Sequence, residues 1–410
     1  MSATMPVEGL EQQLASARRN VALLAIAQAI LGAAPMITFS VGGLAAFQML
    51  GDDKSFATAP LTGFNVGTAI GTILVAILSR YVSRQPTFVF GALLIAAGGL
   101  IAAAAIYLDS FLLLVVGLLL TGIAAGFTQK YRFAAADASP SFYKGTAISW
   151  ILAGGIVSSL IGWQVGTHGK DFLAPFTFAG AFAAFAPMGI LAALSLSFLK
   201  LPETRDAHAS TTEKPRPLAD IVSRPRFLVG MYCGIVSYAL MTFMMTGAPL
   251  AMVHECGFSA DLSTQGITFH VLAMFAPSFF TGRLISRFGA ETIVAIGLGL
   301  LMVCAMIAHA GIELWNFWGA LVLLGIGWNF GFIGGTSIVT HSYRPSEADK
   351  VQAFHDIILF TTVALSSFAS GQVFSAFGWD AMILPVWPLA LIGLALLFFL
   401  VRTSGNPKEV

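Results

Sequence analysis

Two pairs of side chains that bind soft metal ions occur in neighbouring apolar segments. Met241 and Met245 form one pair, and His270 and Met274 form the other. Residues four apart lie on one face of a helix, so each helix would present two ligands together. Thioether and imidazole ligands select Cu(I) over hard cations such as Mg²⁺. The spacing therefore predicts a copper site.

The two pairs fall at matching depths if both segments are helices joined by a short outer loop. At about 1.5 Å per residue, Met245 lies roughly 10 Å and His270 roughly 9 Å from the outer ends. Met241 and Met274 lie roughly 16 and 15 Å down. If the two faces point at each other, three sulfurs and one nitrogen could hold one ion. A single methionine pair is more often a packing feature, so the prediction depends on both pairs.

Cysteines extend this row of ligands in both directions. Cys256 follows His254 in the outer loop, where we expect the pair to capture the ion. Cys233 lies eight residues before Met241, about 80° off its face at ~100° per residue. We expect it to continue a sulfur pathway toward the inner side. Three cysteines in all argue against a disulfide framework.

The composition indicates that most of the chain lies in lipid. Hydrophobic residues make up 57% of the 410 residues and charged residues 10%, against about 25% charged in soluble domains. The net charge of +1 gives no reason to expect a nucleic-acid partner. We find no Walker motif, nucleophile triad or zinc-enzyme spacing, so we expect neither an enzyme nor a prosthetic group. Copper would be the transported solute.

Each spanning helix needs about 20 apolar residues, and the sequence predicts twelve of them. They lie near 20–48, 57–79, 87–107, 111–130, 145–166, 173–199, 227–252, 264–285, 290–311, 315–341, 351–376 and 381–402.

The distribution of charge predicts the orientation of these helices. With both termini cytoplasmic, all 21 Lys and Arg except Lys54 and Lys170 fall on the cytoplasmic side, as the positive-inside rule requires. The acidic residues map to loops or helix ends, with Asp356 and His355 near the inner side. A proton relay built on a carboxylate at mid-membrane is therefore not expected.

The sequence predicts that the chain consists of two related halves. We expect a six-helix bundle at 1–199, a cytoplasmic linker at 200–226 and a second bundle at 227–410, which would carry the metal site. The segment Ser79-Arg80-Tyr81-Val82 is echoed by Ser286-Arg287-Phe288-Gly289. Echoes at a half-length offset indicate an internal repeat.

This arrangement resembles the major facilitator superfamily. The residues that carry the resemblance are the 6+6 helices, the basic central loop and the segment Gly282-Arg283-Leu284-Ile285-Ser286-Arg287-Phe288-Gly289. The resemblance implies an all-α membrane fold of two pseudo-symmetric bundles. The family's loop motif has an acid where this chain has Ser79 and Ser286, which puts charge-relay gating in doubt.

The methionine, histidine and cysteine pattern resembles the CcoA-like copper importers of proteobacteria. The resemblance implies that Met241, Met245, His270 and Met274 bind copper and that Cys233 and Cys256 are functional. It also implies copper import across a bacterial inner membrane by alternating access, with copper chaperones as possible partners. The imported copper would supply assembly of cbb3-type cytochrome oxidase.

Two alternatives stay open. A close branch of that family resembles riboflavin importers, whose cavity would use aromatic and polar side chains such as Trp150, Trp328 and Asn329. The third alternative is an exporter of amphipathic drugs, although the predicted fifth helix lacks the Gly-Pro pair typical of drug antiporters.

Overall fold

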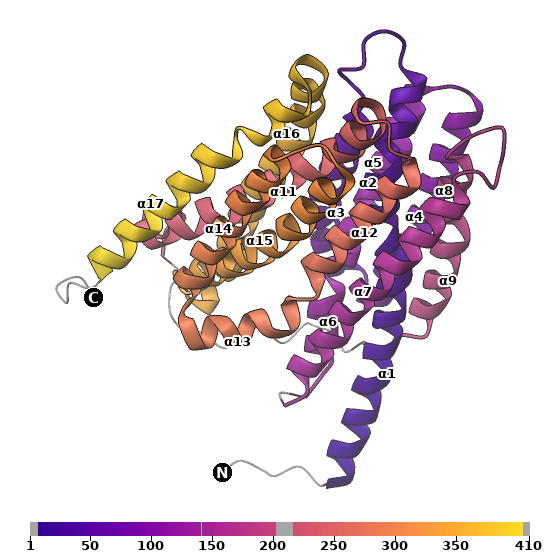
Figure 1. The fold of residues 1–410 in the computed structure, drawn as a ribbon. Coiled ribbons are helices and arrows are strands. Elements are labelled where there is room, and N and C mark those ends of the chain that lie inside the picture. Colours follow the sequence, from indigo (N-terminus) through magenta and orange to yellow (C-terminus); the bar gives the residue numbers. More distant parts are fainter. Residues whose placement is uncertain (1–6, 141, 202–215, 405–410) are drawn as a thin grey trace. The chain divides into compact units, whose positions relative to one another are not determined.

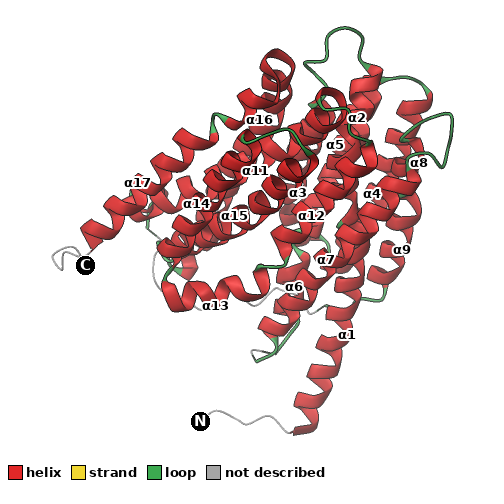
Figure 2. Ribbon diagram, in the orientation of Figure 1, coloured by secondary structure: helices red, strands yellow, loops and turns green. Residues whose placement is uncertain are grey.

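The computed structural model describes residues 7–140, 142–201 and 216–404, and every regular element in these ranges is helical (Figure 1, Figure 2). The chain forms two compact units, one of residues 1–38 with 66–207 and one of residues 39–65 with 208–410. The chain crosses from the first unit to the second within the second helix, after residue 38, and returns within the third helix, after residue 65. The predicted bundles at 1–199 and 227–410 stay a prediction, because residues 202–215 of the linker lie outside the described ranges.

The first unit is built from the helices of the N-terminal part of the chain. Its elements are α1 (Val7–Leu31), the start of α2 (Ala33–Met49), most of α3 (Ala59–Tyr81), α4 (Arg84–Tyr107), α5 (Phe111–Thr128), α6 (Tyr131–Asp137), α7 (Lys144–Gly169), α8 (Ala179–Ala183) and α9 (Phe185–Ser197). Helix α4 packs against α5 and α9, and α1 packs against α7 and α9.

The second unit is centred on α15. It contains the end of α2, the start of α3, α10 (Leu218–Val222), α11 (Pro225–Leu250), a π-helical turn (Ala251–Glu255), α12 (Ala260–Phe275), α13 (Ser278–Phe288), α14 (Ala290–His309), α15 (Leu314–Thr340), α16 (Ala348–Ile383) and α17 (Val386–Ser404). Helix α15 packs against α11, α12 and α14. The pairing of α14 with α15 and α17 repeats that of α4 with α5 and α9.

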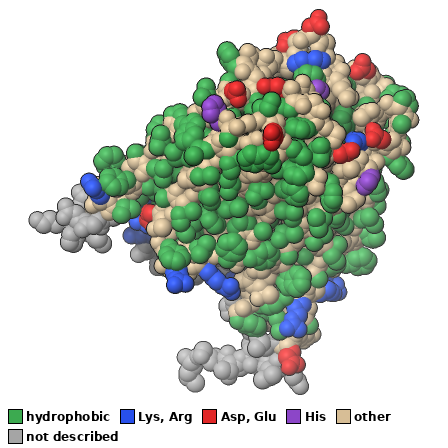
Figure 3. All heavy atoms as spheres, viewed as in Figure 1, with side chains coloured by type: hydrophobic (Ala, Val, Ile, Leu, Met, Phe, Trp, Pro, Cys, Tyr) green, Lys and Arg blue, Asp and Glu red, His purple; other side chains and the backbone are tan. Residues whose placement is uncertain are grey.

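Eleven helical stretches in the described residues are long and apolar enough to cross a bilayer. The remaining predicted helix, 264–285, is divided into α12 and α13 at Pro277. Figure 1 shows α13 turning away from α12. Proline has no backbone N–H and its ring clashes with the preceding turn, so the helix breaks there. Hydrophobic side chains cover most of the face drawn in Figure 3, as a lipid-facing surface requires.

Glycines allow these helices to approach closely. At Gly71 in α3, an added Cβ would collide with the backbone of Ile123 in α5. At Gly325 in α15, it would come 2.6 Å from the carbonyl oxygen of His270 in α12. Small residues at such contacts are the usual means of packing helices in membranes. The contact at Gly325 fixes the position of α12 against α15.

Candidate functional site

His270 is directed toward α15. Its side chain is fully buried, and its Nδ1 lies 2.7 Å from the carbonyl oxygen of Leu321. Because a carbonyl only accepts, Nδ1 is the protonated nitrogen and donates this bond. The other nitrogen, Nε2, has no hydrogen-bond partner among the described residues. Helix α12 packs mainly against α15 and touches α11 only slightly.

The methionine pair of α11 is also buried beside α15. Met241 is 2% exposed and Met245 5%. Met241 lies two helical turns after Gly234, on the stripe of α11 that contacts the backbone of Gly335 in α15. Met274, on α12, is half-buried. Both predicted pairs therefore lie on helices whose shared neighbour is α15, and their role as ligands stays a prediction.

The predicted pathway residues differ in burial and in their contacts. Cys233 is buried, with its sulfur 4.0 Å from the carbonyl oxygen of Gly393 in α17. His254 is exposed and stacks on Phe47, with ring centroids 3.6 Å apart. Cys256 is half-buried after the π-helical turn, and burial with the neighbouring carboxylate of Glu255 raises its pKa. A raised pKa disfavours the thiolate that binds metals.

The described residues contain no group of three or more His, Cys, Asp or Glu side chains arranged to hold a metal ion.

An aromatic cluster lies where α11 meets α15. The ring of Trp328 stacks on Phe332 at 5.4 Å with an interplanar angle of 15°. The ring of Tyr238, from α11, meets Trp328 edge-on at 5.4 Å and Phe332 at 5.2 Å. Stacked and edge-on pairs at these distances are favourable beyond the area they bury. We call these three residues the aromatic platform.

Two polar atoms lie on the same face of α15 as the platform. Trp328, Phe332 and Thr336 follow each other at four-residue spacing, which places them on one face. The buried indole Nε1 of Trp328 and hydroxyl of Thr336 have no hydrogen-bond partner among the described residues. An unsatisfied buried donor costs about 1–3 kcal/mol. A ligand that accepts from these groups would recover that cost.

The platform was only partly predicted from the sequence. Trp328 was named as a cavity residue, but Tyr238, Phe332 and Thr336 were missed. The same four-residue spacing that singled out the methionine pairs would have found Phe332 and Thr336. Trp150, the other predicted aromatic contact, lies in the first unit on α7 and is 56% exposed.

Asn329 holds the break between α12 and α13. Its Nδ2 donates to the Met274 carbonyl and to the Ser278 hydroxyl, both at 2.7 Å. Its Oδ1 accepts from the hydroxyl of Thr281 at 2.6 Å. The side chain thus stabilises the polar groups around Pro277. Asn329 was predicted to contact the solute, and its amide is instead occupied by this network.

The sequence profile of the Major Facilitator Superfamily matches residues 21–348 and also residues 231–410. The chain belongs to the Major Facilitator Superfamily. The all-α fold and the transport function predicted from the sequence are thereby confirmed, and a transporter, not an enzyme, is the class of protein.

Two bacterial relatives of this major facilitator chain cover nearly its whole length. The Riboflavin transporter RfnT of Brucella anthropi is 44% identical over 96% of this chain and 98% of its own. The Uncharacterized MFS-type transporter YddS of Bacillus subtilis is 28% identical over 90% of this chain and 87% of its own.

Two solved structures share the major facilitator fold. The human organic anion transporter MFSD10 has a TM-score of 0.66 at 16% identity, covering 93% of this chain and 99% of its own. A mutant of the nucleoside transporter NupG has a TM-score of 0.68 at 11% identity, covering 92% and 99%. At these identities the likeness concerns the fold alone.

The prediction of copper import is wrong. It is contradicted by the relative at 44% identity, which is named a riboflavin transporter. Copper as a partner, the supply of cytochrome oxidase and the membership of the CcoA-like family lose their support with it. The physical reason is that methionine at four-residue spacing also serves as a packing residue in helices, so the spacing alone does not identify a metal ion as the solute.

Proposed function

We propose that this chain transports riboflavin into the bacterial cell across the inner membrane. The observation that carries the proposal is the 44% identity, over 96% of the chain, to a riboflavin transporter. All Lys and Arg residues except Lys54 and Lys170 fall on the same side of the membrane as the two termini. This distribution favours both termini in the cytoplasm. Transport would proceed by alternating exposure of a site inside the membrane to the two sides.

The aromatic platform suits the chemistry of this solute. Riboflavin carries a flat tricyclic ring system with carbonyl and nitrogen acceptors along one edge. Flat aromatic rings stack on aromatic side chains with a gain of about 1–3 kcal/mol per ring. Trp328 and Phe332 are stacked on each other at 15°, and a flavin ring would extend this stack on an outer face of one of the two rings.

The polar atoms of α15 suit the carbonyl groups and the ribityl chain of riboflavin. The unpartnered indole Nε1 of Trp328 can donate to a ring carbonyl, and the Thr336 hydroxyl can bond the ribityl chain. The residues packed around Tyr238 and Phe332 are apolar: Ile235, Leu359 and Val363, with Met231 and Ile358. An apolar wall with a few placed polar groups is the usual form of a small-molecule site and fits an uncharged solute.

Riboflavin uptake by a bacterial strain that neither makes riboflavin nor has its own importer tests the proposal. We expect the wild-type chain to restore growth at low external riboflavin. Trp328→Ala removes both stacking and the donor, and we expect uptake to fall about ten-fold or more, because about 1.4 kcal/mol is ten-fold. Trp328→Phe keeps a ring and loses the donor, so its uptake should lie between the two.

The matched control is Trp315→Phe, which changes an exposed tryptophan in the first turn of α15. Its uptake should equal wild type. Membrane levels of all variants are compared by immunoblot. Absence of riboflavin uptake by a wild-type chain present at normal level would refute the proposed function. Equal uptake by wild type and Trp328→Ala would refute the role of the platform.

A further inference from the structure

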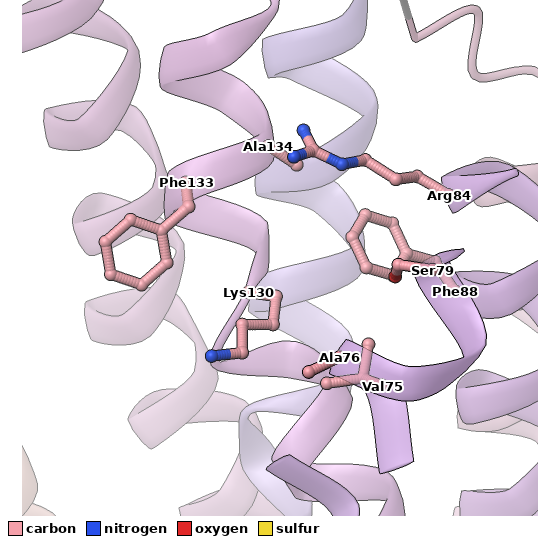
Figure 4. A pocket seen from close by; sticks show the side chains of 8 residues that line it. All are labelled: Val75, Ala76, Ser79, Arg84, Phe88, Lys130, Phe133 and Ala134. Carbon is pink, nitrogen blue, oxygen red and sulfur yellow. The ribbon is translucent and has the colours of Figure 1, made fainter. Parts of the chain in front are cut away.

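A cavity of about 180 Å³ lies in the first unit. It is formed where the end of α3, the start of α4, Lys130 and helix α6 meet (Figure 4). Its lining combines the cations Arg84 and Lys130 and the hydroxyl of Ser79 with apolar side chains, namely Val75, Ala76, Phe88, Phe133 and Ala134. The proposed function does not use this cavity.

The cavity lies at the end of the membrane-spanning segments. One candidate span ends at Ser79, and the next begins at Arg84. A third runs from Phe111 to Asp137, 27 residues, or about 40 Å of helix against a hydrocarbon core of about 30 Å. Its last residues, which include Lys130 and Phe133, therefore extend to the level of the lipid headgroups.

The lining of the cavity includes an exposed aromatic side chain, because Phe133 is 51% exposed. Tyr81, the last residue of α3 and two residues after Ser79 of the lining, is 83% exposed. Tyrosine gathers at the level of the headgroups because one part of its ring is apolar and another tolerates water. The ammonium of Lys130 lies 5.9 Å from the centre of the Phe133 ring. A cation is thus held beside an apolar surface.

The charge of the cavity favours an anion. Arg84 is paired with Asp137 at 2.8 Å, and the pair is partly exposed, with side-chain exposures of 22% and 44%. Lys130 adds a second positive charge to the lining. Basic pockets between helices at the cytoplasmic side of membranes bind the phosphates of lipid headgroups. The apolar wall beside the cations would contact the glycerol and the first carbons of the acyl chains.

We propose that this cavity binds the phosphate of an anionic phospholipid. A cavity of this size accommodates a headgroup phosphate, and the acyl chains lie outside it along the lipid-facing surface. A free phosphate ion shares the same charge chemistry but gains nothing from the apolar wall. The two sources can therefore be separated by experiment.

The purified full-length protein in detergent provides the test. Phosphatidylglycerol, phosphatidylcholine with the same acyl chains, and sodium phosphate are added separately, and lipid retention is measured by native mass spectrometry alongside the midpoint of thermal unfolding. We expect phosphatidylglycerol to be retained and to raise the midpoint. Lys130→Gln should weaken its retention about five-fold, as expected for one basic residue near a membrane surface.

Two further variants keep the test decisive. Lys144→Gln removes an exposed lysine at the start of α7, outside the cavity lining, and should leave retention unchanged. Ala76→Leu fills the cavity with both cations in place and should weaken retention, even if Lys130→Gln proves unstable. Equal retention of the two lipids, equal loss in Lys144→Gln, or a full shift with phosphate alone would overturn the proposal.

Discussion

Trp328 of α15 and His270 of α12 are both buried, and each has one ring nitrogen without a partner among the described residues. The two side chains nevertheless differ in what holds them. The second nitrogen of His270 bonds the Leu321 carbonyl at 2.7 Å, so the imidazole ties α12 to α15. Trp328 has a single nitrogen, held in place by ring packing alone. We therefore assign His270 a structural role and Trp328 a binding role.

His270→Phe separates these roles. The change keeps a ring of similar size and removes the bond to Leu321, so the free energy of unfolding should fall by about 1 kcal/mol. The affinity for riboflavin should not change, since the platform lies on α11 and α15. Thermal unfolding and the quenching of flavin fluorescence on binding measure the two effects.

The control for this variant is His309→Gln, at an exposed position near the end of α14. It should alter neither quantity. A loss of riboflavin affinity in His270→Phe, with unfolding unchanged, would contradict the structural role of His270.

The helices themselves follow largely from hydrophobic composition. The predicted helix at 315–341 corresponds to α15, Leu314–Thr340, and the predicted end at 376 lies close to Gly378, whose φ of +73° interrupts α16. Helix α1 begins at Val7, thirteen residues before the predicted start at 20. Its first turns are polar but contain good helix formers, and hydropathy detects only the part that enters lipid.

The partners of each helix could not be predicted in the same way. Met241 and His270 lie on helices consecutive in the chain, and their matching depths leave open whether the two faces point at each other. The structure gives both helices α15 as the main neighbour. Depth follows from the rise per residue, whereas the rotation and contacts of a helix depend on small residues such as Gly325 on a distant segment.

Arg216 of the linker is bonded to Glu347, in the loop between α15 and α16. We call this contact the anchor. Glu347 is fully buried and accepts bonds from Nε of Arg216 at 2.8 Å and Nη2 at 2.6 Å, and from the backbone N–H groups of Arg216 and Arg344, both at 2.9 Å. The pKa of Glu347 is far below its ordinary value, mainly because of the side-chain bonds from Arg216.

This pKa shift predicts how the stability of the protein depends on pH. A carboxyl whose pKa is lowered by folding stabilises the protein fully above its unfolded pKa, about 4.3, and loses that contribution as pH falls below it. Glu347→Gln should therefore lower the unfolding midpoint by a constant amount from pH 5 to 8. The difference from wild type should shrink below about pH 4.

Glu291→Gln is the matched control, because it breaks the more exposed pair with Arg226. Exposed pairs contribute roughly 0–1 kcal/mol, so its effect should be small. A difference between wild type and Glu347→Gln that grows with acidity would contradict the anchor.

For the whole molecule, the sequence predicted the class and the fold, whereas its main prediction of the solute, copper, was wrong and riboflavin was only an alternative. The low charged fraction and the internal repeat predict a two-part helical transporter, and the helix pairings recur in both units. The solute depends on which buried atoms lack partners, and this follows from packing between distant helices. Trp328 acquires its role through Tyr238, ninety residues earlier in the chain.

Uptake by the purified protein in liposomes is a direct test of riboflavin transport and of the role of Trp328 in it. We predict saturable uptake of radiolabelled riboflavin, reduced about ten-fold or more by Trp328→Ala and retained by His270→Phe. Liposomes with the folded wild-type protein that take up no more riboflavin than protein-free liposomes would contradict the account.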